Sequence, residues 1–193
     1  MSEILRRLHQ DHANGLRLLA MLDRQIETMS GGKRPDWDIV QGIIQYFSTY
    51  PDLGHHPLEN QILTRLRSRH PAAVEPFLGL ENEHRQLSDT LRHMAAVTQR
   101  LVPIVRATYL DLLRSFVAGQ RDHVQREEVE FLVAARRLLD AGDWQELDSA
   151  APKIVDPLSD PADSRFQALR RHFASWDGAD GAERRSNEAT PSG

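Results

Sequence analysis

The chain has 193 residues, of which 40% are hydrophobic and 27% are charged, a composition typical of one globular domain with a hydrophobic core. Its net charge of −4, without a basic stripe, argues against nucleic acid as a partner, and no apolar run is long enough to cross a membrane. The sequence has no cysteine, which excludes disulfides, thiolate metal sites and cysteine nucleophiles, but it has nine histidines, more than expected at this length.

Four long segments repeat apolar residues at spacings of three and four, which is the period of an amphipathic helix. The first segment spans about residues 2–28 and ends at SGGKRP, where two glycines and a proline stop a helix. Its first residues lack the apolar core of a secretory signal, so we expect a cytoplasmic protein. The second segment spans about residues 36–69 and is interrupted by PDLGHHP, whose prolines and glycine should kink the helix or open it briefly.

The third segment begins between residues 71 and 76 and ends near residue 100, and the fourth extends from about Pro103 to Gly142. No stretch alternates polar and apolar residues as a strand does. We therefore predict an all-α protein, an up-down-up-down four-helix bundle formed by residues 1–142. Residues 143–176 are predicted to form a short helical extension packed on the bundle, and residues 177–193 a disordered tail.

Each predicted helix has a histidine where its apolar stripe would otherwise have a leucine. These four residues are His12, His55, His84 and His123. Glu59 follows His55 by four residues, and Glu127 follows His123 at the same spacing, so each pair faces one side of its helix. Counted at ~1.5 Å per residue from each predicted loop, all four histidines fall near one level of the bundle.

A buried cluster of histidines and glutamates without a basic partner is costly unless something neutralises it, and a metal centre does so. Four imidazoles and two carboxylates are too many for one tetrahedral zinc ion but suit six-coordinate iron or manganese. Two bridging glutamates with two histidines on each metal describe a dinuclear centre. The alternative interpretation is four hydrogen-bonded core histidines and two surface glutamates.

The sequence around these residues resembles the hemerythrin-like proteins, a family of cation-binding domains named for a His-His-Glu signature. The resemblance covers about residues 1–142 and depends on the segments QDH, YPDLGHHPLENQIL, LENEHRQL and FVAGQRDHVQREEVEFL. The segment DPLSDPADSRFQALRRHF also resembles the C-terminal extension of some bacterial members. The resemblance implies two iron ions joined by an oxo or hydroxo bridge. The ligands that it implies are His12, His55, Glu59, His84, His123 and Glu127.

The chain departs from the oxygen-carrying hemerythrins at one position. Those proteins have a further histidine one turn before the ligand on the third helix, and this chain has Leu80 there. Two irons have roughly twelve coordination positions in all, and without that histidine two of them stay open. The departure favours a site that meets oxygen, nitric oxide or peroxide, or that exchanges iron, over an oxygen carrier with a single vacancy. Glu81, Glu83 or a tyrosine could instead fill a vacancy.

His56 is the alternative to His55 as a ligand, because the proline that follows it disturbs the ideal helix there. The spacing of His123 and Glu127 favours His55, which would leave His56 as a hydrogen-bonding neighbour or an exposed residue. Further candidates for hydrogen bonding near the metals, or for replacing a ligand, are Tyr50, Glu81, Tyr109 and Gln120.

These features predict a non-haem di-iron protein that binds or reacts with oxygen, nitric oxide or peroxide. If it turns over peroxide or nitric oxide, it is an enzyme. The sequence leaves this question open and assigns no catalytic residue. The alternatives are a sensor of iron, oxygen or nitric oxide, a protein that donates iron to repair damaged iron–sulfur sites, and an interaction module that uses residues 143–176. Each alternative is compatible with a redox partner protein and with either a monomeric or a homodimeric state.

Overall fold

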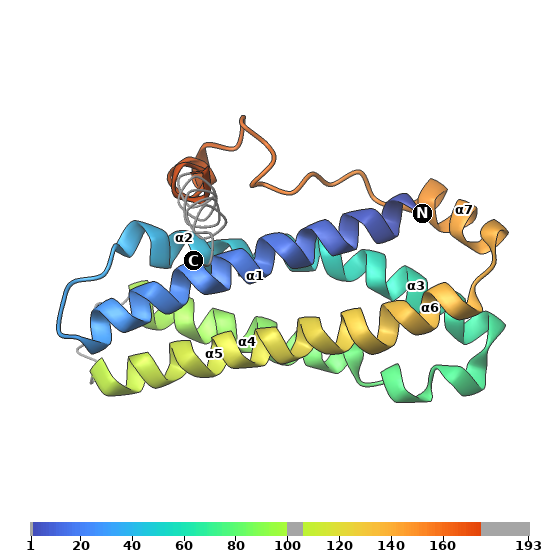
Figure 1. Cartoon of the computed structure of the whole chain (residues 1–193), viewed down its shortest axis with the longest axis horizontal. Helices are drawn as coiled ribbons and strands as arrows, with labels where there is room; N and C mark the ends of the chain where they lie inside the picture. Colours follow the sequence, from blue (N-terminus) through green and yellow to red (C-terminus); the bar gives the residue numbers. More distant parts are fainter. Residues whose placement is uncertain (1, 100–105, 175–193) are drawn as a thin grey trace, which may run out of the picture.

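The structure is a computed structural model that describes residues 2–99 and 106–174. Within these ranges every regular element is a helix, and no strand occurs (Figure 1). The prediction of an all-α protein is therefore confirmed. None of the described helices is both long enough and apolar enough to span a membrane.

The first two rods of the bundle come from the N-terminal part of the chain (Figure 1). The helix α1 (Glu3–Ser30) forms the first rod without interruption, and α2 (Trp37–Phe47) and α3 (His56–Arg69) together form the second. A turn of π-helix, Pro51–His55, connects α2 to α3 in the segment where the sequence predicted a kink or an opening. The prolines of this segment have no N–H to donate, so the α-helical ladder is interrupted and the wider turn takes its place.

The other two rods complete the bundle. The third rod is α4 (Leu80–Gln99), and the fourth consists of α5 (Arg106–Arg126) and α6 (Leu132–Leu138), which a second π-helical turn, Glu127–Phe131, connects. Successive rods run in opposite directions, with α1 packed against α5 and α2 against α4 (Figure 1). The predicted up-down-up-down bundle is therefore confirmed.

The core of the bundle divides into two apolar clusters, one on each side of the level of His12. Leu8 and Leu58 belong to the first cluster, and Leu19 and Phe116 belong to the second. The predicted metal ligands lie along each rod between these two sets of residues and are buried. Apolar side chains therefore close off this polar layer from both ends of the bundle.

The chain after the fourth rod contacts the outside of the bundle. The helix α7 (Ala141–Ala150) follows α6 after two residues, so Gly142 lies in the first turn of α7 and does not end the fourth rod. Asp143 accepts hydrogen bonds from Arg65 and Arg69 of α3 at 3.1 and 2.9 Å. From α7 the chain crosses the outer face of the bundle toward its opposite end (Figure 1).

The last described segment consists of a 3-10 turn, Ser164–Phe166, and a helix formed by residues 167–174. Phe166 and Leu169 are buried in the second apolar cluster, and Leu169 approaches α2 where Gly42 has no side chain. The described part of the predicted extension thus packs on the bundle, and the tail predicted for residues 177–193 lies outside the described residues.

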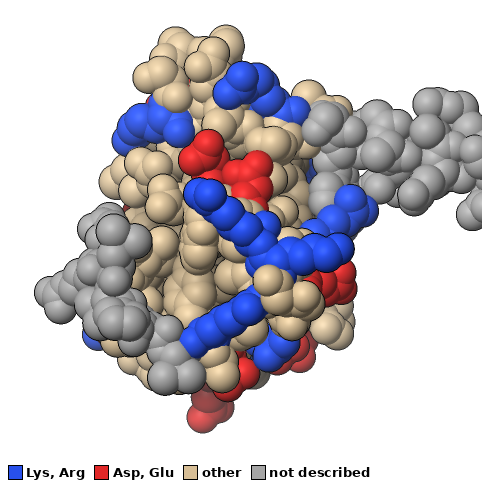
Figure 2. Space-filling model, turned by 90° about the vertical axis from the view of Figure 1, so that its left-hand side faces the viewer, with Lys and Arg blue, Asp and Glu red and all other residues tan. Residues whose placement is uncertain are grey.

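Basic side chains gather at the end of the bundle that carries the loop between α1 and α2 (Figure 2). Lys33, Arg34 and Arg106 line a groove there together with Trp37. Acidic side chains lie among the basic ones on this face (Figure 2). His123 is 17 residues along α5 from Arg106, or ~26 Å, so this groove is separate from the polar layer.

We predict that Asp143→Ala lowers the free energy of unfolding by about 2 kcal/mol, because the change removes both a helix cap and the partner of two arginines. The Asp143 side chain is only 3% exposed and accepts from Arg65 and Arg69, so its loss removes the partner of Arg69 and leaves Arg65 with Glu146 alone. Urea denaturation measures the effect. The control is Glu146→Ala, which removes a carboxylate that is 65% exposed beside the same Arg65 and should cost less than about 0.5 kcal/mol. Equal losses in the two variants would contradict the prediction.

Candidate metal centre

The structure brings the six predicted ligands together in one layer inside the bundle. Each of the four rods contributes at least one of them: His12, His55, Glu59, His84, His123 and Glu127. All six are buried, with between 1% and 7% of their surface exposed. The layer therefore combines four imidazoles and two carboxylates at a depth where unpaired charge is costly.

Glu59 lies between histidines of different rods. Its Oε1 is 3.4 Å from Nε2 of His55 and 3.8 Å from Nε2 of His12. Its Oε2 is 3.3 Å from Nε2 of His84. One oxygen of this carboxylate thus faces the first two rods, and the other faces the third.

Glu127 repeats this arrangement from the fourth rod. Its Oε2 is 3.2 Å from Nε2 of His12, and its Oε1 is 3.0 Å from Nε2 of His123 and 3.3 Å from Nε2 of His84. Each glutamate therefore turns one oxygen toward the pair His12 and His55, and the other toward the histidines of α4 and α5. A carboxylate that bridges two metals needs this arrangement.

The inner atoms of the layer lack the hydrogen bonds that buried polar groups normally have. Both carboxylate oxygens of Glu59, Oε2 of Glu127 and Nε2 of His123 are buried without a hydrogen bond. Within the described ranges, neither glutamate forms an ion pair with a lysine or an arginine. Cations between the carboxylates would supply the missing partners, so the residues fit a pair of metal ions.

A sequence model of one protein family, described as the hemerythrin HHE cation binding domain, matches residues 3–135. The chain belongs to the hemerythrin HHE family. The resemblance found in the sequence is thereby confirmed, and cation binding is the property that the family implies. The match contains all six residues of the layer and ends within α6, before α7 begins. No curated protein matches the chain.

In this hemerythrin domain, a second set of carboxylates contacts Nδ1 of the layer's histidines, the ring nitrogen that does not face the two glutamates of the layer. Nδ1 of His12 lies 2.6 Å from Oε1 of Glu128, and Nδ1 of His55 lies 3.3 Å from Oδ2 of Asp11. With its proton on Nδ1, each ring donates to the carboxylate and keeps the lone pair of Nε2 for a metal. The sequence did not predict the role of Asp11, because this residue precedes His12 and reaches His55 only through the packing of two rods.

Among the further candidates, Tyr50 and Gln120 lie close to the layer. The Tyr50 hydroxyl is 3.0 Å from both carboxylate oxygens of Asp11 and donates to them, so it supports the residue behind His55. Gln120 is buried one turn before His123 and lines a cavity that adjoins the layer.

Two other candidates lie away from the layer. Glu81 is exposed at the start of α4. The Tyr109 hydroxyl is 2.9 Å from the hydroxyl of Thr98, and Tyr109 precedes His123 on α5 by 14 residues, or ~21 Å. Neither residue belongs to the two groups of atoms that could hold a metal.

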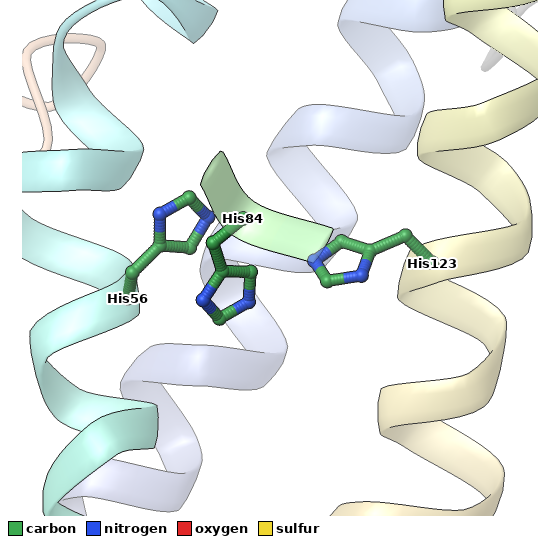
Figure 3. Close-up of side chains that lie close together, drawn as sticks. All are labelled: His56, His84 and His123. Carbon is green, nitrogen blue, oxygen red and sulfur yellow. The ribbon is translucent and has the colours of Figure 1, made fainter. Parts of the chain in front are cut away.

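His56 joins the layer beside His55 and does not take its place. The His56 ring stacks on that of His84, with centroids 3.8 Å apart and planes within 6° of each other (Figure 3). The nitrogen and oxygen atoms that could hold a metal form two groups, each within 4.8 Å, one of which contains His55 and the other His56. The first group is His12, His55, Glu59 and Glu127, and the second is His56, His84 and His123.

A cavity of about 40 Å³ adjoins the layer on the side of the second apolar cluster. Its wall includes His12 and His55 together with Gly15, Phe47 and Leu91. An ordered water needs about 10–15 Å³ on this measure, so the cavity has room for a few waters or for a molecule of two or three heavy atoms.

The groups of the layer shift one another's protonation. Burial alone would raise the pKa of Glu127, but the close imidazoles, first His12 at 3.2 Å, hold it well below its usual range. Burial alone would lower the pKa of His55, but Glu59 and Asp11 raise it well above its usual value. Both shifts favour an ionised carboxylate beside a protonated imidazole, and a ring nitrogen that binds a metal must be free of its proton.

We predict that Gly54→Ala lowers the free energy of unfolding by about 1–3 kcal/mol. A Cβ at position 54 would lie 2.6 Å from Cε2 of Tyr50, so the ring must move and weaken its hydrogen bonds to Asp11. The matched control is Gly119→Ala in α5, where an added Cβ would lie 4.0 Å from Cδ2 of Leu87 and alanine should be neutral or stabilising. Thermal unfolding of the metal-free proteins tests the prediction, which fails if both variants melt at the wild-type temperature.

Proposed function

We propose that this protein holds two iron ions between Glu59 and Glu127 and uses them to bind or react with oxygen, nitric oxide or peroxide. The terminal ligands in this proposal are His12, His55, His84 and His123. The observation that supports it most is the position of the two carboxylates, each with one oxygen toward each set of histidines. The sequence-based expectations of a cytoplasmic location and of an electron-donating partner protein belong to the same proposal.

The donor atoms support iron over other common metals. Four imidazoles and two carboxylates exceed the four positions of a single zinc ion, and calcium and magnesium prefer oxygen donors throughout. Six-coordinate iron accepts both kinds of donor. Two glutamates are also fewer than in ferritin-like di-iron sites, so the layer carries less negative charge and should favour the reduced metal. When bound, two iron ions supply electrons and an open coordination position to a small ligand.

The contribution of the polypeptide is to select ligands by size and to keep bulk water away. The cavity of about 40 Å³ admits only very small molecules. Phe47 and Leu91 make part of its wall apolar, and the two apolar clusters close the bundle above and below the layer. Small uncharged molecules such as oxygen, nitric oxide and hydrogen peroxide match this cavity.

We predict two irons per chain after expression in iron-replete medium, with charge-transfer bands in the visible and near-ultraviolet spectrum. Glu59→Gln and Glu127→Gln should each lose at least one iron, because an amide is a poor bridge between two cations. Metal analysis and absorption spectra measure both effects.

The matched control for these variants is Glu130→Gln, which changes an exposed carboxylate in the same π-helical turn as Glu127 and should keep both irons. One zinc ion per chain, or no metal after iron-replete expression, would defeat the proposal.

We also predict that Gly15→Ala weakens ligand binding without loss of iron. Gly15 lines the cavity, and an added Cβ would be 3.7 Å from the Phe47 ring, an ordinary contact that fills space without a clash. The affinity of the oxidised protein for azide, a three-atom probe, should fall by about tenfold, or 1.4 kcal/mol. A spectroscopic titration measures it, with Gly119→Ala as control, and equal affinities in the two variants would show that ligands bind elsewhere.

A further inference from the structure

His56, His84 and His123 form a cluster of imidazoles supplied by α3, α4 and α5 (Figure 3). The centroid of the His56 ring is 3.8 Å from that of His84 and 6.4 Å from that of His123. One nitrogen of each ring lies within 4.8 Å of the others. His84 and His123 already face the bridging glutamates, so the third imidazole stands beside the same metal position.

The π-helical turn explains how consecutive residues can both reach the layer. In an α-helix neighbouring side chains point about 100° apart, and one of two consecutive histidines would face away. Here the N–H of His56 donates to the carbonyl of Pro51, five residues earlier, which widens the turn. His55 and His56 then have ring centroids only 5.8 Å apart, and the His56 side chain is 12% exposed.

The surroundings of His56 are like those of the other histidines in the layer. Its Nδ1 lies 3.0 Å from Oδ1 of Asp52, just as Asp11 faces His55 and Glu128 faces His12. The Ser88 hydroxyl donates to both oxygens of Asp52, at 3.0 and 3.1 Å, and holds this carboxylate in place. With its proton on Nδ1, His56 has Nε2 free for a metal.

We propose that His56 is a fifth histidine ligand and binds the ion held by His84 and His123. This inference rests on the di-iron function proposed above. It places the additional imidazole on the second rod, in contrast to the oxygen-carrying hemerythrins, which have it on the third. The corresponding position here, Leu80, is packed in the first apolar cluster and offers no donor.

The fifth histidine makes the two metal positions unequal. One ion has three imidazoles and the other has two, from His12 and His55, and both share the glutamates. Of roughly twelve coordination positions, one then remains open in place of the two expected from the sequence. That open position belongs to the ion of His12 and His55, two residues that line the ligand cavity.

If His56 and His84 are to hold one ion, their ring stack would have to open. Two parallel rings with centroids 3.8 Å apart cannot both direct a nitrogen lone pair at the same point, so one of the rings would turn. A side chain that only packs against His84 would keep its position.

The test is to compare His56→Asn with wild type as full-length iron-loaded proteins. The asparagine amide can still donate to Asp52 as Nδ1 does, but it has no counterpart of Nε2. We expect both irons to be present before chelator treatment. A chelator should then remove one of them from the variant roughly 100-fold faster than from wild type. The charge-transfer bands should also shift. His56→Glu, which offers an oxygen donor instead, should restore slow release of the second iron.

The control is His93→Asn, a change at an exposed histidine of α4, which should behave like wild type. Unfolding of the metal-free proteins identifies a purely structural role: loss of stability in metal-free His56→Asn, with unchanged iron release and spectrum, would overturn the inference. Two equally retained irons with the wild-type spectrum would also overturn it and leave the di-iron function standing. A wild-type protein without two irons would defeat the proposed function itself.

Discussion

The burial of Glu59 and Glu127 without a basic partner is the constraint on which the rest of this structure depends. A carboxylate removed from water needs a counter-charge or several hydrogen bonds, and no lysine or arginine pairs with either glutamate within the described ranges. Among the described residues, imidazoles form the charge contacts of both glutamates, and they could balance the charge by carrying protons or by binding the same metal ions. Every rod supplies one of these groups, so the bundle cannot separate its rods without exposing or unbalancing the layer.

The two π-helical turns adapt the backbone to this layer. One turn ends at His55 and the other begins at Glu127, so both wide turns lie at the level of the predicted metal ligands. A π-helical turn inserts one residue into a helix, and such turns are frequent at functional sites. Here the first turn brings two consecutive histidines into contact with the layer, which a regular helix would not allow.

The carboxylates behind the histidines connect the layer to the outside of the bundle. Asp11 binds the hydroxyl of Tyr50, and three residues further on Asn14 donates to Asp156 in the segment that follows α7, at 2.8 Å. The segment after the fourth rod therefore steadies α1 close to His12. This contact lies beyond the part of the chain that the family match covers, and it gives residues 141–174 a structural role on their own bundle.

The sequence by itself determined the four rods, their alternating direction and the six residues of the buried His/Glu layer that are predicted to hold metal. Helical periodicity and the spacing of His55 from Glu59 are local properties, and counting residues from each loop is enough to estimate depth. Only the tertiary structure decided that His56 stands beside His84, that Asp11 supports His55 from another rod, and that Glu81 and Tyr109 lie away from the layer. These relations depend on how far each rod is rotated about its axis and shifted along its neighbours, and on a π-helical turn of one extra residue. A shift of one residue turns a side chain from the core to solvent, and no pattern within a single helix records the position of the helix beside it.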